Sequence, residues 1–235
     1  IYGIPWEWYE TYGIQRLGYH GASHSYVAET LTDLYGSTGK AISCHLGGSG
    51  SLCAIDDGKS VDTSFGISLQ VGVIQSNRCG DIDPFIVPFL QKEGLSLDEV
   101  LDGLTKRGGL LGISGVSNDL RDVQEAADAG NDRAKLAIDV FCNGIVRHIG
   151  AYYAELGGLD HLVFTGGIGE HGTRIRESVC HQLAHMGILL DDKKNQNCTG
   201  ANTVISRDDS PVTIHVIPAN EELGVARKTY AYLRT

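Results

Sequence analysis

Two glycine-rich bends, each placed directly after a short apolar segment, constrain most strongly what this chain can fold into. Residues 45–51 read His-Leu-Gly-Gly-Ser-Gly-Ser, and residues 164–170 read Phe-Thr-Gly-Gly-Ile-Gly-Glu. Glycine supplies 31 of the 235 residues, which is about 13% against roughly 7% in an average protein. Because glycine lets the backbone turn sharply or approach a ligand closely, both bends predict tight connections at the ends of strands.

The order of the apolar segments predicts a mixed β-sheet with helices on both faces, an α/β fold. Three early segments predict a β-meander, because turns rich in glycine and aspartate separate them. The strands are expected over 41–46, 51–55, 60–64, 162–165 and 213–217, and the helices over 24–35, 84–91, 97–105, 117–129, 131–156, 173–187 and 221–233. The aromatic-rich residues 1–19 are expected to form a loop.

The charge balance excludes some classes of partner. The chain carries 29 acidic and 19 basic residues, a net charge of −10. A polyanion needs a basic surface, so this balance argues against a nucleic-acid partner held by general electrostatics and against docking on an anionic membrane. No apolar run approaches the roughly 18 residues that would predict a membrane-spanning helix.

The cysteines indicate the cellular location of the protein, and the first residues indicate whether the chain is part of a longer one. Six cysteines occur without a Cys-x-x-Cys pair, and no secretory signal is visible, so we expect reduced thiols in a cytoplasmic protein. The chain begins at Ile1, and Met186 is its single methionine. We therefore expect it to be a piece of something longer.

Both bends could hold phosphates, and both have an ordinary structural explanation. In the first bend, backbone N–H groups and the hydroxyls of Ser49 and Ser51 could surround an anion, but a flexible hairpin loop would look the same. The second bend could bring the backbone close to a nucleotide at a helix start, or be a tight strand-to-helix connection. It fits neither the Gly-x-Gly-x-x-Gly pattern nor a P-loop.

Two charged segments add candidates for phosphoryl chemistry. Arg78 precedes Gly80 and could direct its guanidinium toward a phosphoryl group; alternatively it pairs with Asp81, while Asp83 caps a helix. Glu221, after the last strand, could hold Mg²⁺ beside phosphates, although acidic residues in a first turn are also favoured by the helix dipole.

Histidine spacing and a second acidic segment leave further alternatives open. His20 and His24, four residues apart, could bind a metal or donate hydrogen bonds to developing charge. His181 and His185 share that spacing, which a half-exposed helix face explains. In residues 114–121, an acid could take ribose hydroxyls and an arginine could lie on a base or phosphate, or Ser117 or Asn118 could simply cap a helix.

Seven motifs, in order along nearly the whole chain, together resemble the acetate kinase family. They are Tyr19-His20-Gly21-Ala22-Ser23-His24, His45-Leu46-Gly47-Gly48-Ser49, Asp62-Thr63-Ser64-Phe65-Gly66, Asn77-Arg78-Cys79-Gly80-Asp81-Ile82-Asp83-Pro84, Gly109-Leu110-Leu111-Gly112-Ile113-Ser114-Gly115, Phe164 to His171, and Asn220-Glu221-Glu222-Leu223. The resemblance implies that residues 1–235 are the C-terminal, nucleotide-binding domain of an actin-like, ribonuclease H-like fold, with the family's N-terminal domain absent from the chain.

The resemblance also implies a reaction and a set of residue roles. ATP would phosphorylate the carboxylate of acetate to give acetyl phosphate and ADP, with Mg²⁺ as cofactor and a homodimer as the assembly. His20 and Arg78 would be catalytic, and Glu221 would bind the magnesium in preference to Glu222. The expected nucleotide-binding residues are His45, Leu46, Gly47, Gly48, Ser49, Asp119, Leu120, Arg121, Gly167, Ile168, Gly169, Glu170 and His171.

The sequence also departs from the family pattern. Gly48 and His171 stand where the family has asparagine, and Tyr19 and Leu69 stand where its acetate pocket often has phenylalanine and proline. The preferred acid could therefore be acetate, propionate or butyrate. A catalytically inactive nucleotide-binding fragment is the alternative function. The constellation of His20, Arg78 and Gly-Asp-Ile-Asp-Pro argues against another actin-like protein, such as a sugar kinase or a chaperone ATPase.

Overall fold

The computed structural model describes residues 1–200 and 202–233, and the chain divides into two compact units. Unit 1 comprises Ile1–Gly18, Gly48–Gly50 and Ser64–Ile145, and unit 2 comprises Tyr19–Gly47, Ser51–Thr63 and Val146–Thr235. The long helix α7 (Asp132–Leu156) passes from the first unit into the second. No helix in the described part of the chain is both long and apolar enough to cross a bilayer.

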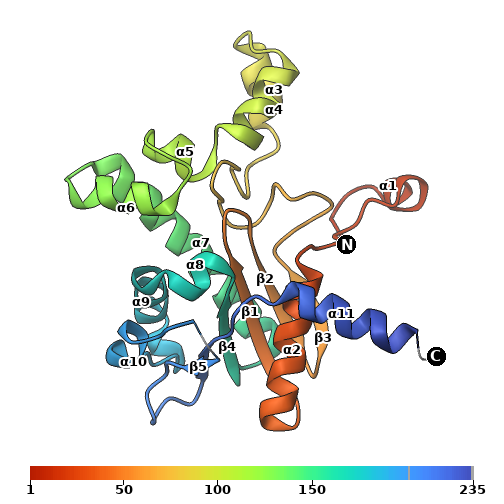
Figure 1. The fold of residues 1–235 in the computed structure, drawn as a ribbon. Coiled ribbons are helices and arrows are strands. Elements are labelled where there is room, and N and C mark those ends of the chain that lie inside the picture. The colour runs from red at the N-terminus through yellow and green to blue at the C-terminus, as the bar shows by residue number, and fades with distance from the viewer. Residues whose placement is uncertain (201, 234–235) are drawn as a thin grey trace. The chain divides into compact units, whose positions relative to one another are not determined.

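Unit 2 is built on a six-stranded sheet with the order β3-β2-β1-β4-β6-β5 (Figure 1). The strands β1, β4 and β6 run parallel, whereas β2 pairs antiparallel with β3 and β5 pairs antiparallel with β6. The strands are β1 (Lys40–Leu46), β2 (Gly50–Asp56), β3 (Lys59–Thr63), β4 (His161–Thr165), β5 (Thr203–Val204) and β6 (Thr213–Val216). The mixed sheet and its initial meander, expected from the sequence, are confirmed.

Helices pack on both faces of this sheet. Side chains alternate along each strand, so successive residues contact helices on opposite faces. On β1, Ser43 lies on the face of helix α2, where its hydroxyl contacts His24 at 2.9 Å. The next residue, Cys44, lies on the opposite face, in electrostatic contact with Cys180 of α9. The helices that contain residues of unit 2 are α2 (Gly21–Tyr35), the end of α7, α8 (Gly166–His171), α9 (Thr173–Gln182), the 3₁₀ turn η1 (Ala184–Met186), α10 (Asp192–Gln196) and α11 (Glu221–Tyr232).

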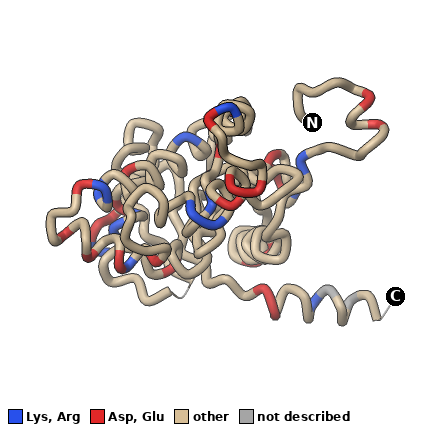
Figure 2. Tube along the Cα trace, turned by 90° about the horizontal axis from the view of Figure 1, so that it is seen from above, with Lys and Arg blue, Asp and Glu red and all other residues tan. Residues whose placement is uncertain are grey.

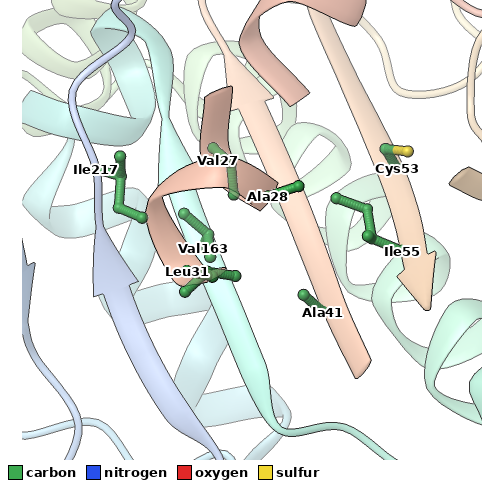
Figure 3. Packing of buried hydrophobic residues seen from close by; sticks show 8 residues of the cluster. All are labelled: Val27, Ala28, Leu31, Ala41, Cys53, Ile55, Val163 and Ile217. Atoms are coloured by element: carbon green, nitrogen blue, oxygen red, sulfur yellow. The ribbon is translucent and has the colours of Figure 1, made fainter. Parts of the chain in front are cut away.

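The hydrophobic core of unit 2 lies between α2 and the sheet (Figure 3). Val27 and Leu31 of α2 are fully buried against Val163 of β4. The remaining members of this cluster are Ala28, Ala41, Cys53, Ile55 and Ile217. Helix α2 ends as the sequence predicts, because Gly36 adopts a left-handed conformation and its N–H bonds the carbonyl of Thr32 at 2.8 Å. The core therefore fixes α2, whose first residues carry the candidate site, against β1 and β4.

Unit 1 is helical in its described elements. They are α1 (Trp6–Tyr12), α3 (Ile86–Lys92), α4 (Leu97–Lys106), α5 (Gly109–Ser114), α6 (Leu120–Asp128) and the first part of α7. A capping box begins α4, with the Ser96 hydroxyl accepting from Glu99 N–H and the Glu99 carboxylate accepting from Ser96 N–H.

The structure corrects several expectations about local elements. The aromatic segment 1–19 contains the helix α1, which buries none of its residues. Helix α5 was not expected, because its glycines lower helix propensity. The single helix expected over 173–187 is divided at Leu183 into α9 and η1. The short elements α10 and β5 were not predicted either, since five and two residues give too little periodicity to detect.

Candidate nucleotide and phosphoryl-transfer site

In unit 2, the two glycine-rich bends begin side by side at one edge of the sheet. β1 and β4 are adjacent parallel strands, with His45 paired in register with Thr165. Their carboxyl ends therefore meet at the same edge, which is where α/β sheets place ligands. Contact between the bends is close: a Cβ on Gly166 would come within 2.7 Å of the Leu46 carbonyl oxygen.

Gly166 and Gly167, in the second bend, differ in the space available for a side chain. Gly166 has a φ of +76°, in the left-handed region, and the Leu46 backbone fills the space where its side chain would be. Gly167 has no atom within 4 Å of the position its Cβ would occupy. Gly166 is therefore required by the fold, whereas Gly167 keeps open the space in front of the bend, where a phosphate could approach.

These two positions predict separable mutational effects. Gly166→Ala is expected to lower the free energy of unfolding by about 2–4 kcal/mol, because it forces a strained backbone and a clash with a neighbouring strand. Gly167→Ala is expected to leave stability within about 0.5 kcal/mol and to weaken ADP binding by filling the open space. Urea unfolding and calorimetry with ADP measure the two effects. Equal losses of stability in both variants would contradict this assignment.

His20 begins α2 in an unusual backbone conformation. Its φ of 59° and ψ of 29° are left-handed, which costs a non-glycine residue about 1–3 kcal/mol and persists only where the surroundings fix it. Its ring stacks on the His45 ring with centroids 4.0 Å apart, and its Nδ1 lies 2.9 Å from the Ser51 hydroxyl oxygen. The candidate catalytic histidine is thus beside the first residue of the first bend.

Two neighbouring histidines are held by serine hydroxyls as well. His45 Nδ1 lies 2.8 Å from Ser23 Oγ, and burial lowers the pKa of His45. His24 Nε2 lies 2.9 Å from Ser51 Oγ. Burial, followed by the neighbouring His45 and His20, lowers the pKa of His24 to about 3. His24 is therefore neutral at physiological pH. The spacing of His20 and His24 that suggested metal binding instead places both rings against one hydroxyl group.

A buried arginine holds the second bend in place through hydrogen bonds. Arg176 of α9 is completely buried, and its Nη1 donates to the carbonyls of Gly169 and Glu170, each at 2.8 Å. Its Nε donates to the Asn195 side chain of α10 at 2.8 Å. The charge-assisted bonds satisfy carbonyls at the end of α8. They fix the helix that carries the expected residues Gly167, Ile168, Gly169, Glu170 and His171.

The candidate magnesium ligand, Glu221, follows a segment that is hydrogen-bonded to the second bend. The Glu170 carboxylate accepts a hydrogen bond from Ala219 N–H at 2.8 Å, two residues before α11 begins. Glu221 and Glu222 are exposed in the first turn of α11, which Figure 2 draws in red. One exposed carboxylate beside substrate phosphates is the donor set that Mg²⁺ uses in kinases, so these residues fit the ion.

In unit 1, Arg78 and the middle of the first bend contact each other directly. Arg78 Nη1 donates to the Ser49 hydroxyl at 3.1 Å and to the Gln75 side-chain oxygen at 3.0 Å. Ser49 in turn donates to the same Gln75 oxygen at 2.9 Å, and the Gly48 carbonyl accepts from Ser76 N–H at 3.2 Å. Asp83 accepts from Phe85 N–H at 2.9 Å, but α3 begins at Ile86 without a side-chain cap, so the expected helix cap at Asp83 is wrong. The expected catalytic arginine and Ser49 of the expected phosphate bend therefore belong to one hydrogen-bonded cluster.

The expected adenosine segment, also in unit 1, is fixed mainly by its own contacts. Asp119 caps α6 and pairs with Arg121 at 2.6 Å. The side-chain and backbone hydrogen bonds from Arg121 lower the pKa of Asp119 to about 2. The cap is thus Asp119, and Ser117 instead accepts from Asp119 N–H at 3.0 Å. The Leu120 side chain is buried, so it supports the helix rather than facing solvent.

Several residues of the site could not be recognised from sequence spacing. Gln75 contacts Ser49 across 26 residues and Arg176 is a buried charge, and no local pattern signals either. Ser51 was a candidate anion donor, but its contacts with His20 and His24 span 31 and 27 residues and were not expected. His181, paired by spacing with His185, instead contacts Asp192 at 3.0 Å. Its ligand atoms and those of Glu177 and Asp192 lie within 4.8 Å of one another, on the surface of α9 and α10.

Known proteins resemble this chain in sequence and in fold. A model of the Acetokinase family matches residues 1–227. An acetate kinase of Dictyoglomus thermophilum is 51% identical over 233 residues, covering 97% of this chain and 58% of that protein. A propionate kinase of Citrobacter rodentium is 49% identical over 231 residues, covering 97% of this chain and 57% of that protein. The crystal structure of Porphyromonas gingivalis acetate kinase matches with a TM-score of 0.95 and 39% identity, over 99% of this chain and 59% of that one. The chain therefore spans less than two thirds of the length of these relatives.

Proposed function

Because the chain belongs to the acetokinase family, we propose that it supplies the nucleotide-binding half of a kinase that phosphorylates a short-chain carboxylate with ATP. The observation that carries the proposal is the pair of glycine-rich bends at the carboxyl ends of β1 and β4, with His20 stacked beside the first of them. A carboxylate oxygen of acetate would attack the γ-phosphorus of ATP, the bond to the β–γ bridging oxygen would break, and acetyl phosphate and ADP would result.

The residues of this chain would act on charge and position. The transferring phosphoryl group spreads negative charge over its oxygens, and donors already in place stabilise that charge most effectively. His20 would donate a hydrogen bond to it and keep its proton. Arg78, whose guanidinium is held by Gln75 and Ser49, would supply a fixed cation.

The nucleotide would be bound by the remaining expected residues. Backbone N–H groups of the two bends would hold its phosphates, and Asp119 and Arg121 would contact the adenosine. Glu221 would bind Mg²⁺, which neutralises charge on the β- and γ-phosphates when it is bound.

The proposal is tested by trapping acyl phosphate with hydroxylamine. The full-length native gene product, ATP and Mg²⁺ are incubated with acetate, propionate or butyrate, since one relative at 49% identity is named a propionate kinase. Hydroxamate formation with one of these acids is expected. Calorimetry with ADP is run in parallel: ADP binding without hydroxamate would leave only the nucleotide-binding alternative, and no binding at millimolar ADP would contradict both functions.

The resemblance also leads us to propose a homodimer located in the cytoplasm. Light scattering of the full-length native gene product at micromolar concentration measures the first property, and a monomeric mass would contradict it. Fractionation of the source cells measures the second.

A further inference from the structure

The hydroxyl of Ser51 lies between two histidine rings in the interior of unit 2. Ser51 Oγ is 2.9 Å from His20 Nδ1 and 2.9 Å from His24 Nε2. On its other side, His24 Nδ1 is 2.9 Å from Ser43 Oγ. Ser51 and Ser43 are completely buried and His24 is 6% exposed. The four side chains form a continuous chain of hydrogen bonds that begins in the interior and ends at the candidate catalytic ring.

The directions of these three hydrogen bonds depend on one another, because each group has a limited number of protons to donate. A neutral imidazole has one donor and one acceptor, and a hydroxyl group has one proton to donate. Burial keeps His24 neutral by lowering its pKa to about 3. If His24 donates from Nε2 to Ser51, the Ser51 proton is available for His20 Nδ1, and a neutral His20 then carries its own proton on Nε2. The tautomer of the outermost ring is thus coupled to the direction of the buried hydrogen bonds.

The backbone of His20 indicates that its ring position is imposed by these surroundings. In the described residues, His20 and Asp57 are the non-glycine residues with positive φ. Asp57 belongs to the turn Asp56-Asp57-Gly58-Lys59 between β2 and β3, where such a conformation is expected. His20 instead starts a helix, where left-handed backbone has no such explanation. Strain of this kind persists where packing and hydrogen bonds over-determine the position.

We propose that Ser51 and His24 are positioning residues, which hold the His20 ring with its proton on Nε2 so that this nitrogen donates to a phosphoryl oxygen. This inference rests on the proposed function, because it presumes that His20 acts on the phosphoryl group. The neighbouring ring follows the same arrangement, since the buried Ser23 hydroxyl holds His45 at Nδ1. His20 and His45 are therefore both oriented through Nδ1 by buried serines.

The test combines kinetics with a direct readout of the tautomer, in the full-length native gene product. Ser51→Ala removes one oxygen atom and is expected to lower kcat roughly 10- to 100-fold, because a misplaced donor loses transition-state stabilisation, with little change in KM for ATP. His20→Ala is expected to lower kcat at least as far. In the double variant, Ser51→Ala should add little to His20→Ala, since residues that act as a unit are not additive.

Nitrogen-15 NMR of the imidazole rings distinguishes positioning from general destabilisation. His20 is expected to be the Nε2–H tautomer in the wild type, and to become a mixture in Ser51→Ala; its signals are assigned by their loss in His20→Ala. Ser51→Cys, which keeps a hydrogen-bonding atom, should retain more of both the tautomer and the kcat. Ser210→Ala removes another serine of unit 2, whose hydroxyl bonds the Gly187 and Val212 carbonyls, and should leave both readouts unchanged.

The outcomes separate the positioning role of Ser51 from the catalytic role of His20. An unchanged His20 tautomer in Ser51→Ala, or a Ser51→Ala effect of equal size in the His20→Ala background, would overturn the positioning role and leave the proposed function standing. An unchanged kcat in His20→Ala would instead refute the catalytic role of His20. If Ser51→Ala does not fold, Ser51→Cys and wild type still give the tautomer comparison.

Discussion

Replacing Arg78 by alanine in the full-length native gene product is expected to lower kcat by about 10³-fold, with the affinity for ADP nearly unchanged. The guanidinium is held in place by the protein itself, because its Nη1 contacts both Ser49 and Gln75. A fixed cation stabilises the charge that develops on the phosphoryl group during transfer, and ADP lacks that group. Steady-state kinetics and calorimetry with ADP measure the two quantities separately.

Two control variants make the Arg78 result specific. Arg78→Lys keeps the positive charge but loses the planar set of donors, and should recover only part of the activity. Arg133→Ala removes another arginine of unit 1, one that donates to the carbonyls of Ile113 and Gly112, and should leave kcat near the wild-type value. If Arg78→Ala retained wild-type kcat, Arg78 would have no part in the mechanism.

The parts of the fold that could be predicted from the sequence are those with local causes. Apolar residues predominate in the strand before each glycine-rich bend, and the second bend supplies the positive φ and the close backbone approach seen at Gly166. Gly36 and Ser96 end and begin helices through contacts within a few residues. Each of these features is encoded by neighbouring positions, so the pattern of the sequence is enough to place it.

The parts that could not be predicted depend on contacts between distant residues. Ser51 lies 31 residues from His20 and 27 residues from His24, and nothing near any of the three indicates that they meet. Arg176 shows no sign in the sequence of being completely buried, because arginine is usually exposed. The order of the motifs nevertheless predicted that His20 and His45 belong to one site. In the structure their segments lie on α2 and on β1, which pack together in the core.

Acidification is expected to destabilise unit 2 strongly between pH 6.5 and pH 5. Burial lowers the pKa of His24 to about 3 and, together with His161, that of His215 to about 4. Histidine in an unfolded chain titrates near 6.5. Above that pH both states are neutral and stability is complete; below it the unfolded state binds protons that the folded state excludes. Each histidine then costs about 1.4 kcal/mol per pH unit, or about 4 kcal/mol for the two together by pH 5.

Urea unfolding at constant ionic strength, followed from pH 7.5 to pH 5, measures this loss directly. The pKa values of His45 and His161 are also lowered by burial, so they add in the same direction. His215→Asn should make the slope shallower by about 1.4 kcal/mol per pH unit, and calorimetry in buffers of different ionisation heat should detect uptake of about two or more protons on unfolding at pH 5. Stability that stays constant over this range would mean that these rings are protonated as readily in the folded chain as in the unfolded one, and hence that they are not desolvated in solution.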